Sequence, residues 1–142
     1  MSALQPINIT AATATLTKDH AGGVITVNRA AGSTLTLPAS SGTGRIFRIY
    51  VGTTITSNSL IVQVANSTDV MAGVCMFAAD AGDTVVAFET AASSDTITMN
   101  GSTTGGIAGT MIELMDVSSG VYWVRIVGAA TGTEATPFSA AV

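Results

Sequence analysis

A catalytic site built on histidine or cysteine would have to use His20 or Cys75, because the 142-residue sequence has one histidine and one cysteine. A Ser–His–Asp or Cys–His set needs a histidine held in a fixed orientation beside the nucleophile. His20 lies among the polar and glycine residues 18–23, which predict an exposed turn. Cys75 lies in the apolar run 74–77, where a cysteine usually packs as a small buried hydrophobe. We therefore expect no catalytic residue and no enzyme activity.

Metal sites are also poorly supported by the residue types. One histidine and one cysteine cannot supply the ligands of a structural zinc site. Calcium binds clustered carboxylates, and four aspartates lie at the ends of expected strands: Asp69, Asp80, Asp83 and Asp95. Residues 80–83 lack the dense alternating oxygens of an EF-hand loop. Aspartate is common in turns because its side chain bonds to nearby backbone, so we predict turn residues at all four positions.

Two further patterns could bind a substrate. Glu89 and Glu113 could be proposed as the carboxylate pair of a glycosidase, but the sequence shows no aromatic sugar platform to accompany them. Glycine-rich residues 42–44 and 105–109 are followed neither by Gly-Lys-Ser/Thr nor by a helix pattern, so they do not match phosphate-binding loops. We predict turns at both glycine-rich segments, and no cofactor or metal.

The charge content limits the partners of this chain. Charged residues make up 10% of the sequence and the net charge is −4, with four arginines and one lysine. Nucleic-acid binding depends on lysine and arginine neutralising phosphates, and binding to an anionic membrane depends on a basic helix, so neither partner is expected. The largely apolar run 70–79 is too short to cross a bilayer, and the first residues do not resemble a signal peptide. A surface with so few charges predicts burial against copies of the chain or another protein.

The elements that position these residues are expected to be short strands. Thr, Val and Ile are β-branched and fit a pleated sheet, whereas strong helix formers never gather into a periodic stretch. Turn residues recur about every 8–12 positions, which is typical of a sandwich or barrel. The expected strands cover residues 14–17, 24–28, 33–37, 45–51, 60–64, 70–77, 84–89, 96–99, 111–114 and 121–127. We predict an all-β chain with one small β-sandwich or β-barrel (jelly-roll-like) domain and extended terminal arms.

Several local features are specific enough to test. Residues 45–51 alternate polar and apolar, which predicts one buried face, whereas residues 70–77 are apolar on both faces and indicate a central strand. Residues 40–44 are expected to form a flexible loop and residues 80–83 a tight turn. Asn100 and Gly101 are a pair that favours a turn with positive φ. Residues 111–114 and 121–127 are expected to form a hairpin around residues 118–120.

Both chain ends differ from this core in composition. Residues 1–13 and 129–142 are predicted to be arms that flank a core of residues 14–128 and become ordered against a neighbouring subunit. Tyr122 and Trp123 are adjacent and face opposite sides of a strand, so one is expected in the core and the other at an interface. The predicted oligomer or capsid interface comprises Ile7, Ile9, Tyr122, Trp123, Pro137 and Phe138.

The order of several segments resembles small virion proteins of tailed bacteriophages. Residues 21–28 are followed by Thr36-Leu37-Pro38, a glycine-rich loop at 42–44 and an alternating strand from Arg45. Residues 111–116, with Gly120 and Trp123 after them, fit the same pattern, which extends over residues 16–127. The chain is similar in this respect to phage head-decoration, or cement, proteins. The resemblance implies an all-β fold, commonly trimeric, on the outer capsid at junctions between capsomers.

We therefore expect a virion structural protein that is made in the host cytoplasm and binds the outer surface of a phage capsid. Its expected partners are the major capsid protein and further copies of itself in a homotrimer. Many weak contacts acting together would reinforce the capsid through multivalency. The alternative is a phage fibre, spike or receptor-binding knob that recognises a surface glycan, since related sequences occur in such appendages.

Overall fold

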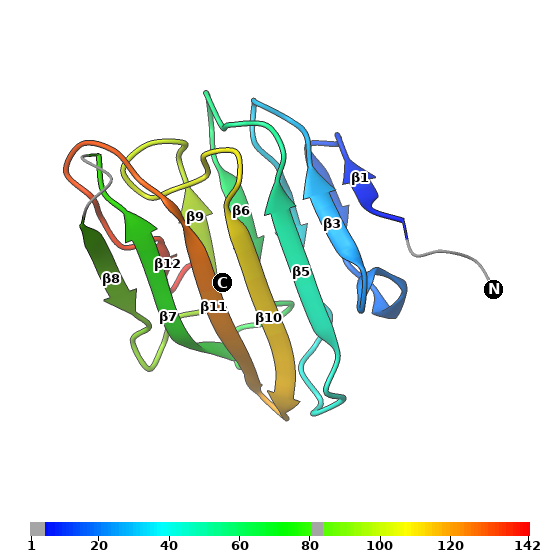
Figure 1. Ribbon diagram of the computed structural model, residues 1–142. Coiled ribbons are helices and arrows are strands. Elements are labelled where there is room, and N and C mark those ends of the chain that lie inside the picture. The colour runs from blue at the N-terminus through cyan, green and yellow to red at the C-terminus, as the bar shows by residue number, and fades with distance from the viewer. Residues whose placement is uncertain (1–4, 81–83) are drawn as a thin grey trace.

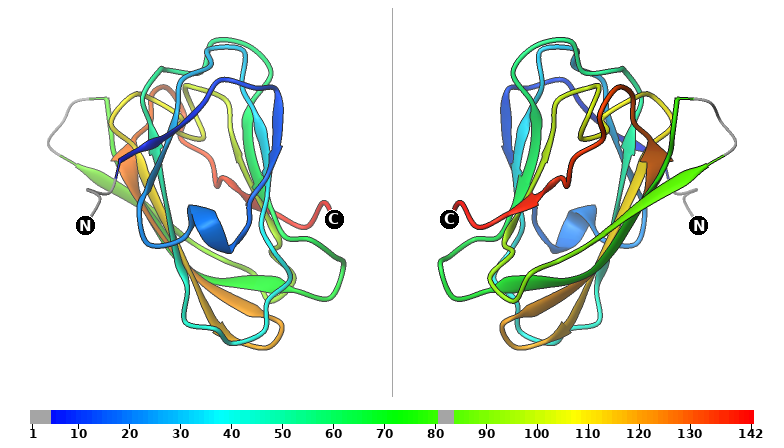
Figure 2. Two further views of the ribbon diagram at one scale, coloured as in Figure 1. Left: turned by 90° about the vertical axis from the view of Figure 1, so that its right-hand side faces the viewer. Right: turned by 90° about the vertical axis from the view of Figure 1, so that its left-hand side faces the viewer.

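The computed structural model describes residues 5–80 and 84–142, and within them the chain forms a β-sandwich. A seven-stranded sheet lies in front of a five-stranded sheet in the view of Figure 1, and Figure 2 shows the two layers from their edges. The prediction of a single small all-β domain is confirmed, with sandwich rather than barrel architecture. The one helical element in these residues is a 3-10 turn, η1 (Lys18–His20), so no helix there is long enough to span a membrane.

The larger sheet has the strand order β1-β3-β5-β10-β11-β7-β8. Its strands are β1 (Ile7–Ile9), β3 (Val24–Val27), β5 (Ile46–Val51), β7 (Val70–Ala78), β8 (Val85–Glu89), β10 (Met111–Ser118) and β11 (Val121–Ala129). The smaller sheet has the order β12-β9-β6-β4-β2. Its strands are β2 (Thr13–Thr15), β4 (Thr34–Thr36), β6 (Leu60–Gln63), β9 (Thr96–Met99) and β12 (Phe138–Ser139).

The first half of the chain winds between the two sheets. Strands β1, β3 and β5 pair in parallel in one sheet, and β2, β4 and β6 pair in parallel in the other. Parallel neighbours need a crossover connection, and here each crossover includes a strand of the opposite sheet. This winding was not predicted from the sequence, because strand patterns do not reveal which sheet a strand joins.

The predicted hairpin around residues 118–120 joins β10 and β11, which pair antiparallel with a register shift between Asp116 and Ser118. β11 also pairs in parallel with β7 along nine residue pairs, from Val121↔Val70 to Ala129↔Ala78. The hairpin therefore occupies the middle of the seven-stranded sheet, and β7 and β8 extend the sheet beyond it (Figure 1).

The hydrophobic core lies between the two sheets and is built by alternate residues of their strands. β5 buries Phe47, Ile49 and Val51, as its alternating sequence predicts. Other fully buried core side chains are Ile25, Leu35, Leu60, Val62, Ile97, Met99, Ile112, Leu114, Val124 and Ile126. Successive side chains of a strand point to opposite faces. In the larger sheet, the residues between the core residues therefore form the outer face.

Residues 70–77 were predicted to form a central strand because they are apolar on both faces; β7 is paired along both edges, but only one of its faces is covered. It lies between β11 and the edge strand β8, and only one face is covered by the core, through Met71, Cys75 and Phe77. Its other face, which includes Val74 and Met76, is exposed. In β7 the apolar residues of one face pack in the core, and the apolar residues of the other face are exposed.

The remaining local predictions had mixed outcomes. Gly101 has φ of 87°, as expected for the turn at residues 100–101. Residues 40–44, predicted to be a flexible loop, are instead tied to Asp116 by several hydrogen bonds. The predicted tight turn at residues 80–83 lies largely outside the described residues.

Both predicted arms contain short strands at the edges of the sandwich. In the N-terminal segment, β1 pairs with β3 and buries Ile9. In the C-terminal segment, β12 pairs with β9 through Phe138↔Ile97, and Phe138 reaches the core. These segments are thus ordered against their own chain, and contact with a neighbouring subunit stays a prediction.

Candidate interaction surface

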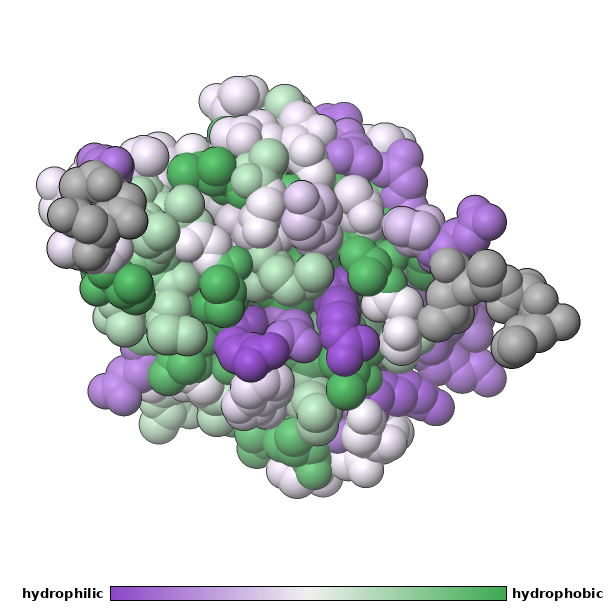
Figure 3. Space-filling model, viewed as in Figure 1, coloured by the Kyte–Doolittle hydropathy of each residue, from purple (hydrophilic) through white to green (hydrophobic). Residues whose placement is uncertain are grey.

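The outer face of the seven-stranded sheet exposes large apolar side chains on neighbouring strands. On β11, Val127 is 49% exposed and Trp123 is 36% exposed. On β7, Val74 is 45% and Met76 is 41% exposed, and on the edge strand β8 Val85 is 67% exposed. Single exposed apolar residues are ordinary, whereas a contiguous exposed apolar patch is a candidate interaction surface. Figure 3 shows green, hydrophobic residues across this face.

The strand register shows that these side chains are neighbours. One cross-strand row contains Tyr50, Met111, Val127, Met76 and Ala87, from β5 to β8. Directly opposed side chains on one face of a sheet lie about 5 Å apart, so this row forms a continuous apolar band. We call the outward residues of β5, β10, β11, β7 and β8 the outer sheet face.

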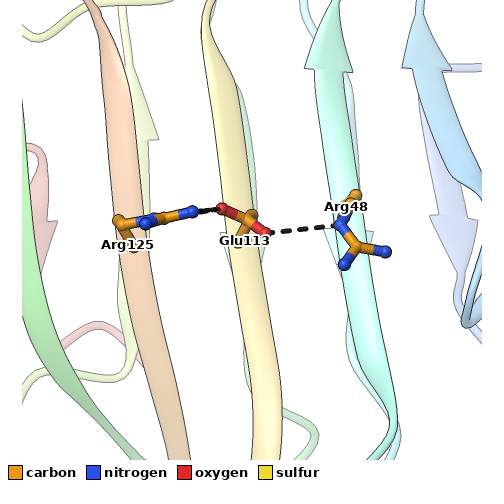
Figure 4. A network of polar contacts seen from close by, with 3 residues as sticks. All are labelled: Arg48, Glu113 and Arg125. Atoms are coloured by element: carbon orange, nitrogen blue, oxygen red, sulfur yellow. Dashed lines mark hydrogen bonds and ion pairs between the residues drawn. The ribbon is translucent and has the colours of Figure 1, made fainter.

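The next row of the outer sheet face is charged. Glu113 lies between Arg48 and Arg125 on the adjacent strands, and all three side chains point outward (Figure 4). Arg48 Nε is 3.3 Å from Glu113 Oε2, and Arg125 donates to Glu113 Oε1 from Nε at 3.0 Å and also from Nη2. The hydrogen bond from Arg125 is the main cause that lowers the pKa of Glu113, so Glu113 is ionised and the triad of Arg48, Glu113 and Arg125 has a net charge of +1.

Arg125 also contacts the aromatic residue of this face. Its guanidinium carbon is 5.8 Å from the ring centroid of Trp123, within the range of a cation–π interaction. Arg125 of the charged row thus contacts the Trp123 indole, which stays partly exposed to solvent. A partner that covers this face meets a preorganised surface rather than one that must be ordered on binding.

The structure separates the six residues that the sequence assigned to an interface. Trp123 lies on the outer sheet face, as expected for one member of the Tyr122–Trp123 pair. Tyr122 is 1% exposed, donates to the Pro38 carbonyl at 2.7 Å, and packs edge-on against Phe47. Ile7 is half-buried and Ile9, Pro137 and Phe138 are buried against the sandwich edges. Sequence reasoning missed Val74, Met76 and Val127, although the two-sided apolar run at residues 70–77 was the signal for the first two.

A buried carboxylate, Asp116, organises the end of the sandwich below this face. Its oxygens accept hydrogen bonds from Ser40 Oγ at 2.9 Å, from the backbone N of Ser41 and Gly42 at 3.0 and 2.8 Å, and from Thr43 Oγ1 at 2.7 Å. Burial raises the pKa of Asp116, but the hydrogen bonds from Thr43, Gly42 and Ser40 outweigh burial and hold the pKa far below its usual range. The carboxylate has its lone pairs occupied, so its role is structural.

The candidate chemical residues do not form a catalytic set. His20 accepts a hydrogen bond from the backbone N of Thr17 at 3.0 Å and caps η1. Cys75 is buried, and desolvation raises the pKa of its thiol to about 12. Among residues 5–80 and 84–142, no three His, Cys, Asp or Glu side chains form a group that could hold a metal ion.

The register also tests the proposed glycosidase pair. Glu113 and Glu89 belong to one cross-strand row, separated by Arg125 and Val74. Three strand spacings of about 4.8 Å put their backbones about 14 Å apart, whereas glycosidase carboxylates are about 5–9.5 Å apart. The two glutamates therefore lack the spacing of such a pair.

Comparison with known proteins adds no relative: no family model, no curated protein and no solved structure matches this chain.

Proposed function

We propose that this protein is a virion structural protein that binds the outer surface of a phage capsid and reinforces it as a decoration protein. The observation that supports the proposal is the outer sheet face, where apolar side chains of five neighbouring strands share one cross-strand row and those of β5, β11 and β7 are exposed. A partner that covers these side chains gains about 25 cal/mol for each Å² of apolar surface removed from water.

The composition of this face suits attachment in many copies. Arg48, Glu113 and Arg125 of its charged row pair with one another, which partly compensates the charge that a partner must desolvate to cover it. A rigid sandwich needs little ordering on binding, which lowers the free-energy cost of association. In this proposal the major capsid protein is the partner and the protein is a homotrimer, whose three faces act together through multivalency.

Quantitative mass spectrometry of purified phage particles tests this proposal. A copy number comparable to that of the major capsid protein would support head decoration. A copy number far below it would favour the alternative, a fibre, spike or receptor-binding knob. Absence of the chain from particles would contradict both functions.

A matched pair of substitutions tests the role of the outer sheet face. Val127→Glu places a charge in the middle of the apolar row, and Thr15→Glu places the same charge at an exposed position on β2 of the smaller sheet. We expect Val127→Glu to weaken sedimentation with undecorated capsids at least tenfold, and Thr15→Glu to bind like the wild type. Equal binding by both variants would show that the capsid contacts another surface.

A further inference from the structure

The few positive charges of this chain are concentrated at one corner of the sandwich. Three of its five basic residues, Lys18, Arg45 and Arg48, line one pocket of about 420 Å³. Lys18 belongs to η1, Arg45 directly precedes β5, and Arg48 belongs to β5. The described lining of this pocket contains no acidic residue, although the whole chain has a net charge of −4.

A second pocket continues the first on the other side of Arg48. It has a volume of about 220 Å³ and shares Gly22 and Arg48 with the first pocket. Its lining includes Pro6 and Val24, whereas the first pocket includes Ala21 and Ile46. We call the two together the basic groove. Its lining combines small apolar residues with cationic side chains over two adjoining pockets, so it suits an extended chain rather than one small ion.

The cations of the basic groove are available to a ligand. Lys18 and Arg45 are exposed, and neither forms an ion pair with any residue in the described part of the chain. Arg48 contacts Glu113 through Nε alone, so its two terminal nitrogens are not used in that ion pair (Figure 4). Glu113 is shared with Arg125, which leaves one positive charge on the triad.

The nearest acidic groups lie outside the lining of the groove. Asp19 follows Lys18 in the chain but does not line the groove. Asp116 lies close to the loop before Arg45, and its oxygens accept hydrogen bonds from residues 40–43 rather than from the groove cations. A ligand in the groove therefore contacts cationic side chains directly, although the whole protein has a net charge of −4.

We propose that the basic groove binds an acidic segment of a partner protein, with glutamate or aspartate carboxylates on Lys18, Arg45 and Arg48. The inference names a second contact for the proposed protein-binding function, and it rests on that function for the source of the segment. Guanidinium groups match carboxylates in shape and hydrogen-bond geometry, and small apolar side chains of a peptide fit between them. The described lining of both pockets has no aromatic ring for stacking a sugar or a base.

Fluorescence anisotropy with the purified full chain tests this inference. The probe is a labelled eight-residue peptide of alternating glutamate and alanine, and its control has glutamine for every glutamate. We expect binding of the glutamate peptide that weakens with added NaCl, and at least tenfold weaker binding to the double variant Lys18→Ala/Arg45→Ala. Arg29→Ala is the matched control, because Arg29 lies outside the basic groove, and it should bind like the wild type. Thermal unfolding of each variant checks that the fold is retained.

Several results would overturn the inference. They are no binding up to millimolar peptide, equal binding of the glutamine peptide, equal losses in the Arg29 and double variants, or preferential binding of a sulfated oligosaccharide. The inference and the proposed function can fail separately. Particle-bound protein that ignores the peptide contradicts the groove alone, and peptide binding by a protein absent from particles contradicts the virion function alone.

Discussion

Thr43 donates two hydrogen bonds to the same oxygen of Asp116, from its backbone N at 3.1 Å and from Oγ1 at 2.7 Å. The two residues are 73 positions apart in the chain. Their contact fastens the loop that precedes β5 to β10, so the middle strands of the outer sheet face are held in register near one end. We therefore expect Asp116 to stabilise the fold rather than to take part in a reaction.

Asp116→Asn is expected to destabilise the fold by about 3 kcal/mol. The amide nitrogen would face N–H groups that now donate hydrogen bonds to the carboxylate, and those groups would lose their acceptor. Chemical denaturation at neutral pH measures this loss. Asp19→Asn is the control, since Asp19 is exposed, and it should change stability by less than about 0.5 kcal/mol. Equal stability of the Asp116 variant and the wild type would contradict the structural role.

The same carboxylate predicts a loss of stability in acid. The folded pKa of Asp116 lies below the unfolded value of about 3.9, so its stabilisation is complete above that value and is lost as pH falls through the folded pKa. In the wild type, the free energy of unfolding should therefore decrease as the pH is lowered below about 4. Asp116→Asn should show a shallower acid slope, and an unchanged slope would refute the assignment.

A second carboxylate ties down the C-terminal segment. Asp95 Oδ1 accepts hydrogen bonds from the backbone N of Ala141 at 2.8 Å and of Val142 at 3.3 Å. Burial raises the pKa of Asp95, and these donors together with Thr96 lower it below the usual value. Deleting residues 141 and 142 removes two donors while much of the burial remains, so the pKa of Asp95 should rise. Carboxyl NMR titration of both chains measures it, and an unchanged pKa would contradict the contact.

The thiol of Cys75 should be unreactive in the native state. Cys75 is buried and its pKa is raised to about 12, so little reactive thiolate forms near pH 8. We expect no reaction with Ellman's reagent until denaturant is added, then one thiol per chain. Because the unfolded thiol ionises near pH 8.5, its contribution to stability is present below that pH and declines as pH rises toward 12. Cys75→Ala should show a shallower alkaline slope, and rapid native labelling would contradict the burial.

Most strands could be predicted from the sequence because their signal is local, whereas β1 and β12 lie in segments that were predicted to be arms. The alternation in residues 45–51 predicted which face of β5 is buried, and the turn residues 118–120 predicted the closing hairpin. The parallel order of the sheets could not be predicted, because partner choice depends on contacts between strands far apart in the chain. The Asp116 contacts could not be predicted for the same reason, since Thr43 and Asp116 are 73 positions apart. The composition of residues 40–44 also predicted a flexible loop.

The candidate surface could be predicted only in part. One of Tyr122 and Trp123 was expected in the core and the other at an interface, because adjacent strand residues face opposite sides; the structure buries Tyr122 and leaves Trp123 partly exposed, and the interface itself stays a prediction. The exposed valines and methionine of β7 and β11 were missed because an apolar run was taken as evidence of burial on both faces. Sequence patterns report that a face is apolar, and the sheet order decides whether this chain covers it.

Deleting residues 1–10 tests the N-terminal segment. The deletion removes β1, including Ile9, which packs in the core, and exposes the edge of β3. We expect the sandwich to stay folded with unfolding free energy lower by about 3 kcal/mol, since burial of one isoleucine contributes about 1.5–3 kcal/mol and the β1 hydrogen bonds are also lost. Denaturation curves and sedimentation with undecorated capsids measure the two effects, and we expect weaker capsid binding.

Ile9→Ala separates the two effects of that deletion. It removes the core contact but keeps the segment, so it should lower stability without weakening capsid binding. If Ile9→Ala weakens binding as much as the deletion, lost stability is the cause and the segment makes no contact of its own. If the deleted chain binds capsids as tightly as the full chain, the N-terminal segment has no part in attachment, and the outer sheet face alone must account for it.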